Sequence, residues 1–511
     1  MTVGKRWAVV AGHPAAAAAG ARQFESSGNF IDAAIAASSA LGVAMPHASG
    51  IGGDAFVLVR EGSSGAVHVL NASGAAPIAA RASMFVDGVP QRGPKAALVP
   101  GLVAAWDALH RRWGRAAWRG LHDAAIDLAE SGTPATASLM RAVRLSYEAL
   151  RRDPGCAQLL FAGTPLDVGV AVRQPALGRA MRAIAAEGAR VFYEGWISRS
   201  LCEGVRAAGG LLDRADLAAY TPVWDAPVSM RYRECDVVVA APNSVGVLLL
   251  MQLNALAQRD VAELLGSPED RICRQMRAMQ AVFDEALGAI TDPRHMRVAP
   301  RDLLAQQTTA RVVEAMQRGA AGPTSLPAGG TACVLTADAA GNACCIVQSV
   351  FNPFGAHFLE PSTGILLNNR MFCFDADPRH VNCVGPGKRS LHTLNPVMVT
   401  RGERLAWVFA SPGGMSQTTT GVQMMMNLID RGMTPRDAID DPRWATDRRG
   451  GLLVEPRMPD PVHEALRARG LPVTRVDDEY IFGSAKLIEL TADGGLIAAA
   501  DRRRNAAAEA G

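Results

Sequence analysis

One change of pattern constrains the fold of this chain more than any other feature. Between residues 100 and 330, apolar residues recur at helical spacing. A Pro- and Gly-rich segment, residues 319–330, then ends at Thr331. After it, residues 331–337 and 343–350 flank a Gly-Asn turn and predict a β-hairpin. We therefore divide the chain into a helix-rich part, 1–330, and a strand-rich part, 331–511.

Thr331 stands at the boundary between these two parts, directly after Gly329 and Gly330. If the Gly330–Thr331 peptide bond breaks, Thr331 gains a free α-amine beside its own hydroxyl. One residue then supplies both nucleophile and general base. An unperturbed α-amine has a pKa of ~7.7–8.0, so much of it is neutral near pH 7. Taken alone, the residue is better explained as a structural threonine, since β-branched residues favour strands.

Composition excludes several classes of protein. The 511 residues suffice for two or three domains, and 49% hydrophobic residues support a large core. A net charge of +3 argues against a nucleic-acid surface, and we expect the run 502–504, three arginines, to be a solvated end. No secretory signal or bilayer-spanning stretch is visible.

The cysteines and histidines predict neither disulfides nor a metal. Nine cysteines occur without a Cys-x-x-Cys pair, which favours reduced thiols in a cytoplasmic protein. The ten histidines are scattered and form no metal-ligand cluster. We expect no cofactor.

Several elements outside the hairpin are predicted. Residues 31–43 form a buried helix capped by Asn29, followed by a glycine-rich loop, 46–54, and a strand, 55–59. The loop lacks the dinucleotide-binding pattern. A strand at 405–410 ends in Ser-Pro-Gly-Gly, residues 411–414, before a helix. Backbone N–H groups at such a junction can stabilise an oxyanion.

Ordered segments along nearly the whole chain resemble the gamma-glutamyltransferase family of N-terminal-nucleophile hydrolases. Each is short, but together and in order they are specific. Before Thr331 they are His13-Pro14, Gly28-Asn29, Asp32-Ala33-Ala34, Gly50-Ile51-Gly52-Gly53, Val99-Pro100-Gly101, Phe192-Tyr193, Gly209-Gly210, Asp216-Leu217-Ala218 and Tyr220. After it they are Asp338, Gly341-Asn342, Phe354-Gly355, Gly364-Ile365-Leu366-Leu367-Asn368-Asn369, Pro386-Gly387-Lys388-Arg389 and Ser411-Pro412-Gly413-Gly414.

This resemblance implies a fold and a mechanism. The fold is α/β, a four-layer αββα sandwich with two facing sheets between helices. The precursor would cut itself into 1–330 and 331–511, and Thr331 would carry an acyl group that water or an amine then attacks. Gly413 and Gly414 match the oxyanion-hole glycines of the family. Ser349 matches a second hydroxyl that hydrogen-bonds the nucleophile.

The chain departs from the family where a gamma-glutamyl donor is held. Ser73 aligns with the arginine that binds the donor α-carboxylate, and His392 and Thr393 replace two serines. Cys373 replaces an acidic residue that holds the α-amine, and Phe351 replaces an asparagine, although Asn352 is adjacent. A serine cannot replace a bidentate arginine–carboxylate contact. Glutathione is therefore disfavoured, and the pattern is more similar to the acylase-type branch, such as cephalosporin acylases.

Arg370 offers a possible substitute for the lost arginine. One hypothesis is that it binds a substrate carboxylate; the alternative is that it pairs with Asp375 or Asp377 and never meets substrate. His392 is not needed as general base, since the freed amine serves, but it is a candidate for the pocket lining. Cys333 is expected to pack in the core on the same strand face as Thr331.

Three functions remain open on sequence alone. The first is an autoprocessed amidohydrolase or acylase acting on a small-molecule amide, with water or an amine as acceptor. The second is a genuine gamma-glutamyl transferase or hydrolase with an altered donor clamp, and the third is an uncleaved, non-catalytic scaffold. In the first two, the fragments should stay associated, because the strands of 331–511 need the helices of 1–330 to bury their faces.

Overall fold

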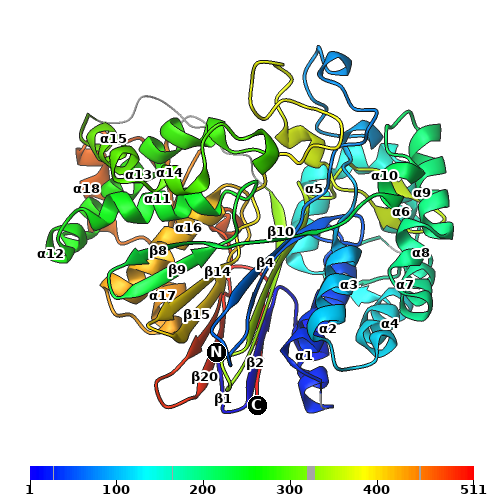
Figure 1. The fold of residues 1–511 in the computed structure, drawn as a ribbon, viewed down its shortest axis with the longest axis horizontal. Helices are drawn as coiled ribbons and strands as arrows, with labels where there is room; N and C mark the ends of the chain where they lie inside the picture. Colours follow the sequence, from blue (N-terminus) through cyan, green and yellow to red (C-terminus); the bar gives the residue numbers. More distant parts are fainter. Residues whose placement is uncertain (27, 164, 319–328, 448–449) are drawn as a thin grey trace.

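The computed structural model describes residues 1–511 except 27, 164, 319–328 and 448–449. Two seven-stranded sheets face each other at the centre, and helices cover the outer face of each, so the molecule has four layers (Figure 1). The predicted αββα architecture is confirmed. The two chain termini lie close together at one end of the sheets (Figure 1).

Both sheets are antiparallel throughout. The strands of the first, in spatial order, are β1 (Thr2–Gly4), β20 (Leu496–Ala500), β19 (Lys486–Leu490), β15 (Arg404–Ala410), β14 (Val397–Arg401), β9 (Cys235–Val239) and β8 (Val228–Tyr232). Those of the second are β21 (Ala507–Ala510), β2 (Trp7–Ala11), β10 (Gly330–Asp338), β11 (Ala343–Phe351), β3 (Asp54–Arg60), β4 (Val67–Ala72) and β7 (Val223–Asp225).

Alternation along the strands builds the apolar layers. On β10, Cys333 and Leu335 point between the sheets and pack with Met398 and Ile488 of the first sheet. Val334 points the other way, into the helices. Because side chains alternate along a strand, Thr331 shares the inter-sheet face with Cys333. The predicted nucleophile therefore lies at the edge of the apolar layer between the two sheets.

The helices form two outer layers. Those that cover the second sheet are chiefly α1 (Pro14–Glu25), α2 (Phe30–Ala44), α3 (Leu102–Trp113), α4 (Asp123–Ser131), α7 (Pro175–Glu187), α8 (Arg190–Tyr193) and α9 (Trp196–Ala207). Those on the first sheet's side are chiefly α11 (Gly246–Ala257), α12 (Val261–Leu265), α13 (Pro268–Ala286), α15 (Gln306–Arg318), α16 (Ser416–Met425), α17 (Pro435–Asp440) and α18 (Asp460–Ala468). Helices α5 (Ala137–Arg152) and α6 (Pro154–Phe161) pack in a separate cluster with Phe354.

The strongest local predictions are confirmed. Strands β10 and β11 pair as a hairpin around the Gly341 turn, with Leu335 opposite Cys345. The Asn29 side chain caps α2, accepting from two backbone N–H groups, while Asp32 closes the capping box. On helix α5, Leu139, Val143 and Leu150 are buried, whereas Tyr147 is 41% exposed.

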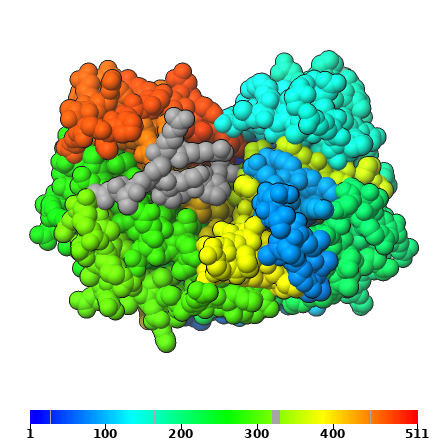
Figure 2. Space-filling view, turned by 90° about the horizontal axis from the view of Figure 1, so that it is seen from above, coloured from blue at the N-terminus to red at the C-terminus, as the bar shows by residue number. Residues whose placement is uncertain are grey.

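Strands from both sides of the Gly330–Thr331 bond contribute to each sheet. In the second sheet, β10 and β11 lie between β2 and β3. On the outside, residues 76–98 and 371–384 share one apolar cluster, and these segments lie beside each other in Figure 2 as blue and yellow patches. Neither part of the chain forms a complete sheet without the other.

The expectation of a solvated end at residues 502–504 is wrong for two of the three arginines. Arg503 and Arg504 are only 7% and 9% exposed, while Arg502 remains at the surface. The chain beyond them returns to the second sheet as β21, paired with β2. The run of three arginines predicted exposure wrongly because Arg503 binds the buried carboxylates of Glu455 and Asp501, and the sequence pattern does not identify them as its partners.

All nine cysteines are unpaired thiols. In the described part of the chain, no helix has the length and apolar character required to cross a membrane.

Candidate active site

Thr331 lies buried at the start of β10, between the two sheets. Its Oγ1 is 3.4 Å from Nε2 of Gln417, which donates to it from the first turn of α16. Gln417 Oε1 in turn accepts from the backbone N–H of Asn395, 3.1 Å away. Gln417 had no distinguishing sequence signal beyond its place after the Gly-Gly junction.

Ser349 lies on the neighbouring strand β11 and contacts the bond that would be cut. Its hydroxyl donates to the carbonyl oxygen of Gly330 and accepts from the N–H of Phe351 at 2.7 Å. The resemblance predicted a hydrogen bond to the nucleophile itself. In the intact chain the Ser349 hydroxyl instead polarises the scissile carbonyl, because Gly330 pairs across the hairpin with Phe351.

Gly413 and Gly414 lie next to the chain that precedes the scissile bond. They have φ values of 141° and 61°, which strongly favour glycine. A methyl group on Gly329 would lie 3.3 Å from Gly414 Cα, so Gly329 runs directly against this turn. Among the described residues, none accepts a hydrogen bond from the N–H of either glycine. Both groups are therefore available to an oxyanion.

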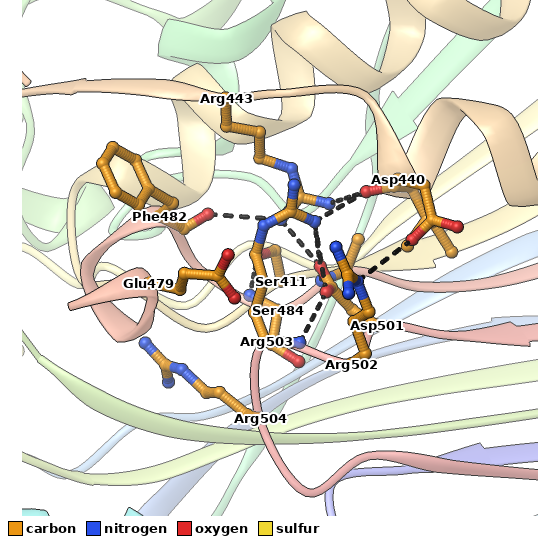
Figure 3. Close-up of polar contacts among 12 residues, drawn as sticks. Ser411, Asp440, Arg443, Glu479, Phe482, Ser484, Asp501, Arg502, Arg503 and Arg504 are labelled. Carbon is orange, nitrogen blue, oxygen red and sulfur yellow. Dashed lines mark hydrogen bonds and ion pairs between the residues drawn. The ribbon is translucent and has the colours of Figure 1, made fainter. Parts of the chain in front are cut away.

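A buried network of polar side chains, drawn in Figure 3, contacts the glycine turn through Ser411. The Ser411 hydroxyl donates to the Pro412 carbonyl at 3.1 Å and accepts from the N–H of Ser484 at 3.3 Å. Asp501 accepts from the next N–H, that of Ala485, at 2.9 Å, and pairs with Arg443 at 2.8 Å. The turn is thereby tied to the residues that lead into β19.

A second buried cluster contains Arg370, His392 and Thr393, three of the predicted substrate-binding residues. Asp54, at the start of β3, lies directly opposite Ser349 in the strand register. Its Oδ2 is 2.7 Å from His392 Nε2 and 3.3 Å from Arg370 Nε. Arg370 lies in a short helix, Arg370–Cys373, and its Nη1 donates to Thr393 Oγ1 at 3.1 Å. These side chains are essentially inaccessible to solvent.

The protonation states in this cluster follow from its contacts. Burial raises the pKa of Asp54, but Arg370 and His392 outweigh that effect and bring it below its usual value. Burial lowers the pKa of His392 to about 4; Arg370 acts in the same direction and Asp54 opposes it. His392 is therefore neutral at pH 7. Its Nδ1 accepts from the N–H of Leu394, so Nε2 carries the proton and donates to Asp54.

The structure gives Arg370 a partner that neither hypothesis named. It pairs with Asp54, whereas Asp377 pairs with Arg379. Its Nη2 is buried without a hydrogen-bond partner among the described residues. Its guanidinium stacks over the Phe351 ring at 4.6 Å, and a methyl group on Gly329 would lie 3.5 Å from that same ring. Arg370 thus reaches the immediate surroundings of the scissile bond.

The other predicted binding residues differ in their availability. Ser73 is fully engaged: its hydroxyl donates to Asn71 at 2.6 Å and accepts from Asn243 at 3.2 Å. Its carbonyl accepts from Arg389. Cys373 lies beside Arg370 with its pKa raised to about 11 by burial. Both nitrogens of His392 are used internally, so this ring supports the cluster rather than a ligand.

Asp54 is the main residue that sequence reasoning missed. It closes the glycine-rich loop, 46–54, for which the sequence predicted no catalytic or binding role. An acidic residue at the end of such a loop, opposite a hydroxyl in a hairpin partner, was a usable signal. Its partners are 316 and 338 positions away, and nothing local pointed to them.

The two-sheet fold, the buried threonine at the start of β10 and the glycine turn are the features of an autoprocessed N-terminal-nucleophile amidohydrolase. The gamma-glutamyltranspeptidase family model matches residues 16–511, and the chain belongs to that family. It is 32% identical to the glutathione hydrolase-like YwrD proenzyme of Bacillus subtilis, over 99% of this chain and 98% of that protein. It is 31% identical to the oxamate amidohydrolase proenzyme of Klebsiella pneumoniae, over 98% and 97%. The crystal structure of cephalosporin acylase from Bacillus halodurans superimposes with a TM-score of 0.93 at 31% identity, covering 100% and 96%.

Proposed function

We propose that this chain cuts itself between Gly330 and Thr331 and then hydrolyses small amides whose acyl part carries a carboxylate. The observation that carries the substrate class is the buried Arg370 guanidinium, which has an unused Nη2 and stacks on the Phe351 ring that Gly329 also approaches. The acyl-enzyme forms on Thr331, and water is the acceptor. Acyl transfer to an amine is the alternative outcome of the same intermediate.

The precursor itself illustrates where an acyl group binds. Gly330 is the acyl side of the scissile bond, with its carbonyl on Ser349 and the preceding residue against Gly414. After cleavage, departure of this segment leaves the same space for a substrate amide. The Thr331 hydroxyl attacks the amide carbonyl while its α-amine takes the proton. The N–H groups of Gly413 and Gly414 stabilise the oxyanion, and the protonated amine delivers the proton to the leaving nitrogen.

The charge of the site disfavours gamma-glutamyl donors. Such a donor brings an ammonium as well as a carboxylate. The only carboxylate in the Arg370 cluster of described residues, Asp54, is already committed to Arg370 and His392. Binding a second cation would mean burying it beside Arg370, which is unfavourable. Two relatives are an oxamate amidohydrolase and a cephalosporin acylase, and an amide substrate of this kind does not require that ammonium.

The test is a substrate panel on Arg370→Met and Arg370→Lys. We expect Arg370→Met to lower kcat/KM for a dicarboxylic monoamide roughly 30- to 100-fold, because a charge-assisted hydrogen bond is worth ~2–3 kcal/mol. A neutral amide of equal length should change less than threefold. Arg370→Lys should fall between, since it keeps the charge but loses the planar fork.

Two controls make the panel decisive. Arg60→Met removes another buried arginine, at the opposite end of β3, where it binds the carbonyls of Gly341 and Glu403. It should leave the substrate preference unchanged. Thr331→Ala should be inactive and uncut by intact mass. If Arg370→Met leaves hydrolysis of the monoamide unchanged, or lowers both amides equally, the substrate proposal fails. Faster hydrolysis of a gamma-glutamyl anilide than of either amide would favour the transferase alternative.

We also propose a cytoplasmic location, supported by the nine unpaired thiols. Cell fractionation with compartment markers tests it; recovery with an extracytoplasmic marker would contradict it.

A further inference from the structure

The buried charges behind the glycine turn fall into two groups. Arg443 and Arg503 are matched by carboxylates: Arg443 lies 2.8 Å from Asp501, and Arg503 binds both Asp501 and Glu455. Figure 3 shows the contacts of Arg443 and Arg503 with Asp501 as dashed lines, while none reaches Arg504. Burial raises the pKa of Asp501, yet Arg443 and Arg503 bring it to about 2, so this carboxylate is ionised. In this part of the network, the carboxylates of Asp501 and Glu455 balance the two guanidinium charges.

Lys486 and Arg504 form the second group, and no described carboxylate lies within 4 Å of either. Lys486 is 2% exposed, and its Nζ donates to the carbonyl and hydroxyl of Ser484 at 2.8 and 3.0 Å. Arg504 stacks over the Tyr480 ring at 3.5 Å and gives one hydrogen bond to the Tyr480 carbonyl. Its Nε and Nη1 are buried without a partner.

A third unsatisfied group lies in the same region. His47 is fully buried, and neither ring nitrogen has a partner among the described residues. Arg141 of α5 also stacks on the Tyr480 ring, at 4.5 Å. Helix α5 packs with Phe354, and the Phe354 ring lies 6.3 Å from that of His47. Burial, assisted by the charge of Arg504, lowers the pKa of His47 to about 3, so it is a neutral donor.

These groups lie near the start of β10, the strand that carries the nucleophile. A methyl group on Gly330 would lie 3.2 Å from the carbonyl of His47. The charges of Lys486 and Arg504 both act on Cys333, two residues beyond Thr331. Cys333 cannot balance them, because burial raises its pKa to about 11 and the thiol stays neutral. Asp501 is the carboxylate that acts on both Lys486 and Arg504, and it is already paired with Arg443 and Arg503. Buried cations that share one committed carboxylate are costly, and N–H donors without acceptors lose ~1–3 kcal/mol each.

We infer that Arg504, Lys486 and His47 form a binding site for a small monovalent anion, a halide or a short carboxylate, behind Thr331. The anion accepts from Arg504 Nε and Nη1 and from one His47 N–H, and it balances the buried cations. It must be small, since every side chain of the site is more than nine-tenths buried. The site is distinct from the Arg370 cluster, which lies on the β3 side of the nucleophile strand.

Crystals of the Thr331→Ala precursor grown in sodium bromide test the site directly. We expect an anomalous peak in contact with Arg504 Nε and Nη1, absent in the Arg504→Met variant of the same protein. If no bromide binds but crystals grown with acetate in its place show electron density in contact with Arg504, the ligand is a carboxylate. Crystals of both kinds with no density there would overturn the inference.

A solution experiment on substrate-free protein separates this inference from the proposed function. At constant ionic strength, replacing gluconate by bromide should raise the unfolding temperature by roughly 1–3 °C in a saturable way. Arg504→Met and Lys486→Met should lose that increment. Arg401→Met, which removes an exposed arginine stacked on Trp407 at 5.0 Å, should retain it. Equal bromide responses in all four proteins would contradict the site, whatever the substrate panel shows.

Discussion

At the scale of single residues, Ser349 is the side chain whose role the structure changes most. Its hydroxyl lies on the Gly330 carbonyl, where negative charge develops when Thr331 attacks its own peptide bond. Removing one such donor costs about 10²–10³ in rate. We therefore expect Ser349→Ala to slow self-cleavage about 100-fold, and Ser349→Thr to process close to the normal rate. A time course of precursor loss on denaturing gels measures this.

The matched control for Ser349 is Ser198→Ala. Ser198 is equally buried, on α9, where its hydroxyl donates to the Gly195 carbonyl at 3.0 Å. It should process normally. If Ser349→Ala is cut as fast as the unsubstituted chain, the contact with Gly330 has no part in cleavage.

The residues that sequence reasoning found and missed differ in one physical respect. Thr331, Gly413 and Gly414 are recognisable because the backbone around them is special, at a strand start or a tight turn. Asp54 and Arg370 matter through each other, and their 316-residue separation leaves no trace in local pattern. The sequence showed that the family's donor-binding residues are replaced in this chain. It did not show that Arg370 pairs with Asp54.

At the scale of elements, the glycine turn depends on the strand beside it. Ser411 links this turn to Ser484, at the residues that lead into β19. Without that hydroxyl the N–H groups of Gly413 and Gly414 lose part of their fixed orientation. We expect Ser411→Ala to lower kcat roughly tenfold with KM changed less than twofold, since oriented donors act mainly on the transition state.

The stability cost of Ser411→Ala should be about 1 kcal/mol, the typical value of one hydrogen bond. Urea unfolding at pH 7 checks this, and Ser198→Ala again serves as control. A rise in KM with unchanged kcat would place Ser411 in ground-state binding and contradict its positioning role.

Elements whose partners are near in sequence were predictable, and those closed by distant charges were not. The β10–β11 hairpin and the capped helix α2 follow from turn and capping signals. The burial of Arg503 follows from Glu455, directly after strand β17 (Leu452–Val454), and from Asp501, directly after β20. No periodicity distinguishes such a run of arginines from a solvated one.

At the scale of the whole molecule, four histidines are buried in their neutral form. Burial lowers the pKa of His47 and His122 to about 3, and that of His357 and His392 to about 4. In the unfolded chain each titrates near 6.5. Between pH 6.5 and about 4 the unfolded state therefore binds protons that the folded state does not, and stability falls as the pH decreases.

We expect the free energy of unfolding of the Thr331→Ala precursor to fall steeply from pH 7 to pH 5. Each of the four groups contributes up to ~1.4 kcal/mol per pH unit once its unfolded form is protonated. Asp501 acts in a lower window: its pKa of about 2 adds stability above pH ~4 that is lost only as the pH falls toward 2. Urea titrations at half-unit steps resolve the two windows.

His122→Gln tests the assignment to buried histidines. His122 is fully buried against Trp106 and Trp118, with Nδ1 3.0 Å from Ser39 Oγ. Glutamine cannot take up the proton, so the slope between pH 6 and 4 should fall by about one proton. His463→Gln, at a partly exposed position on α18, should leave it unchanged. A precursor whose stability is flat between pH 7 and 5 would mean that these rings are hydrated or already protonated in the folded state.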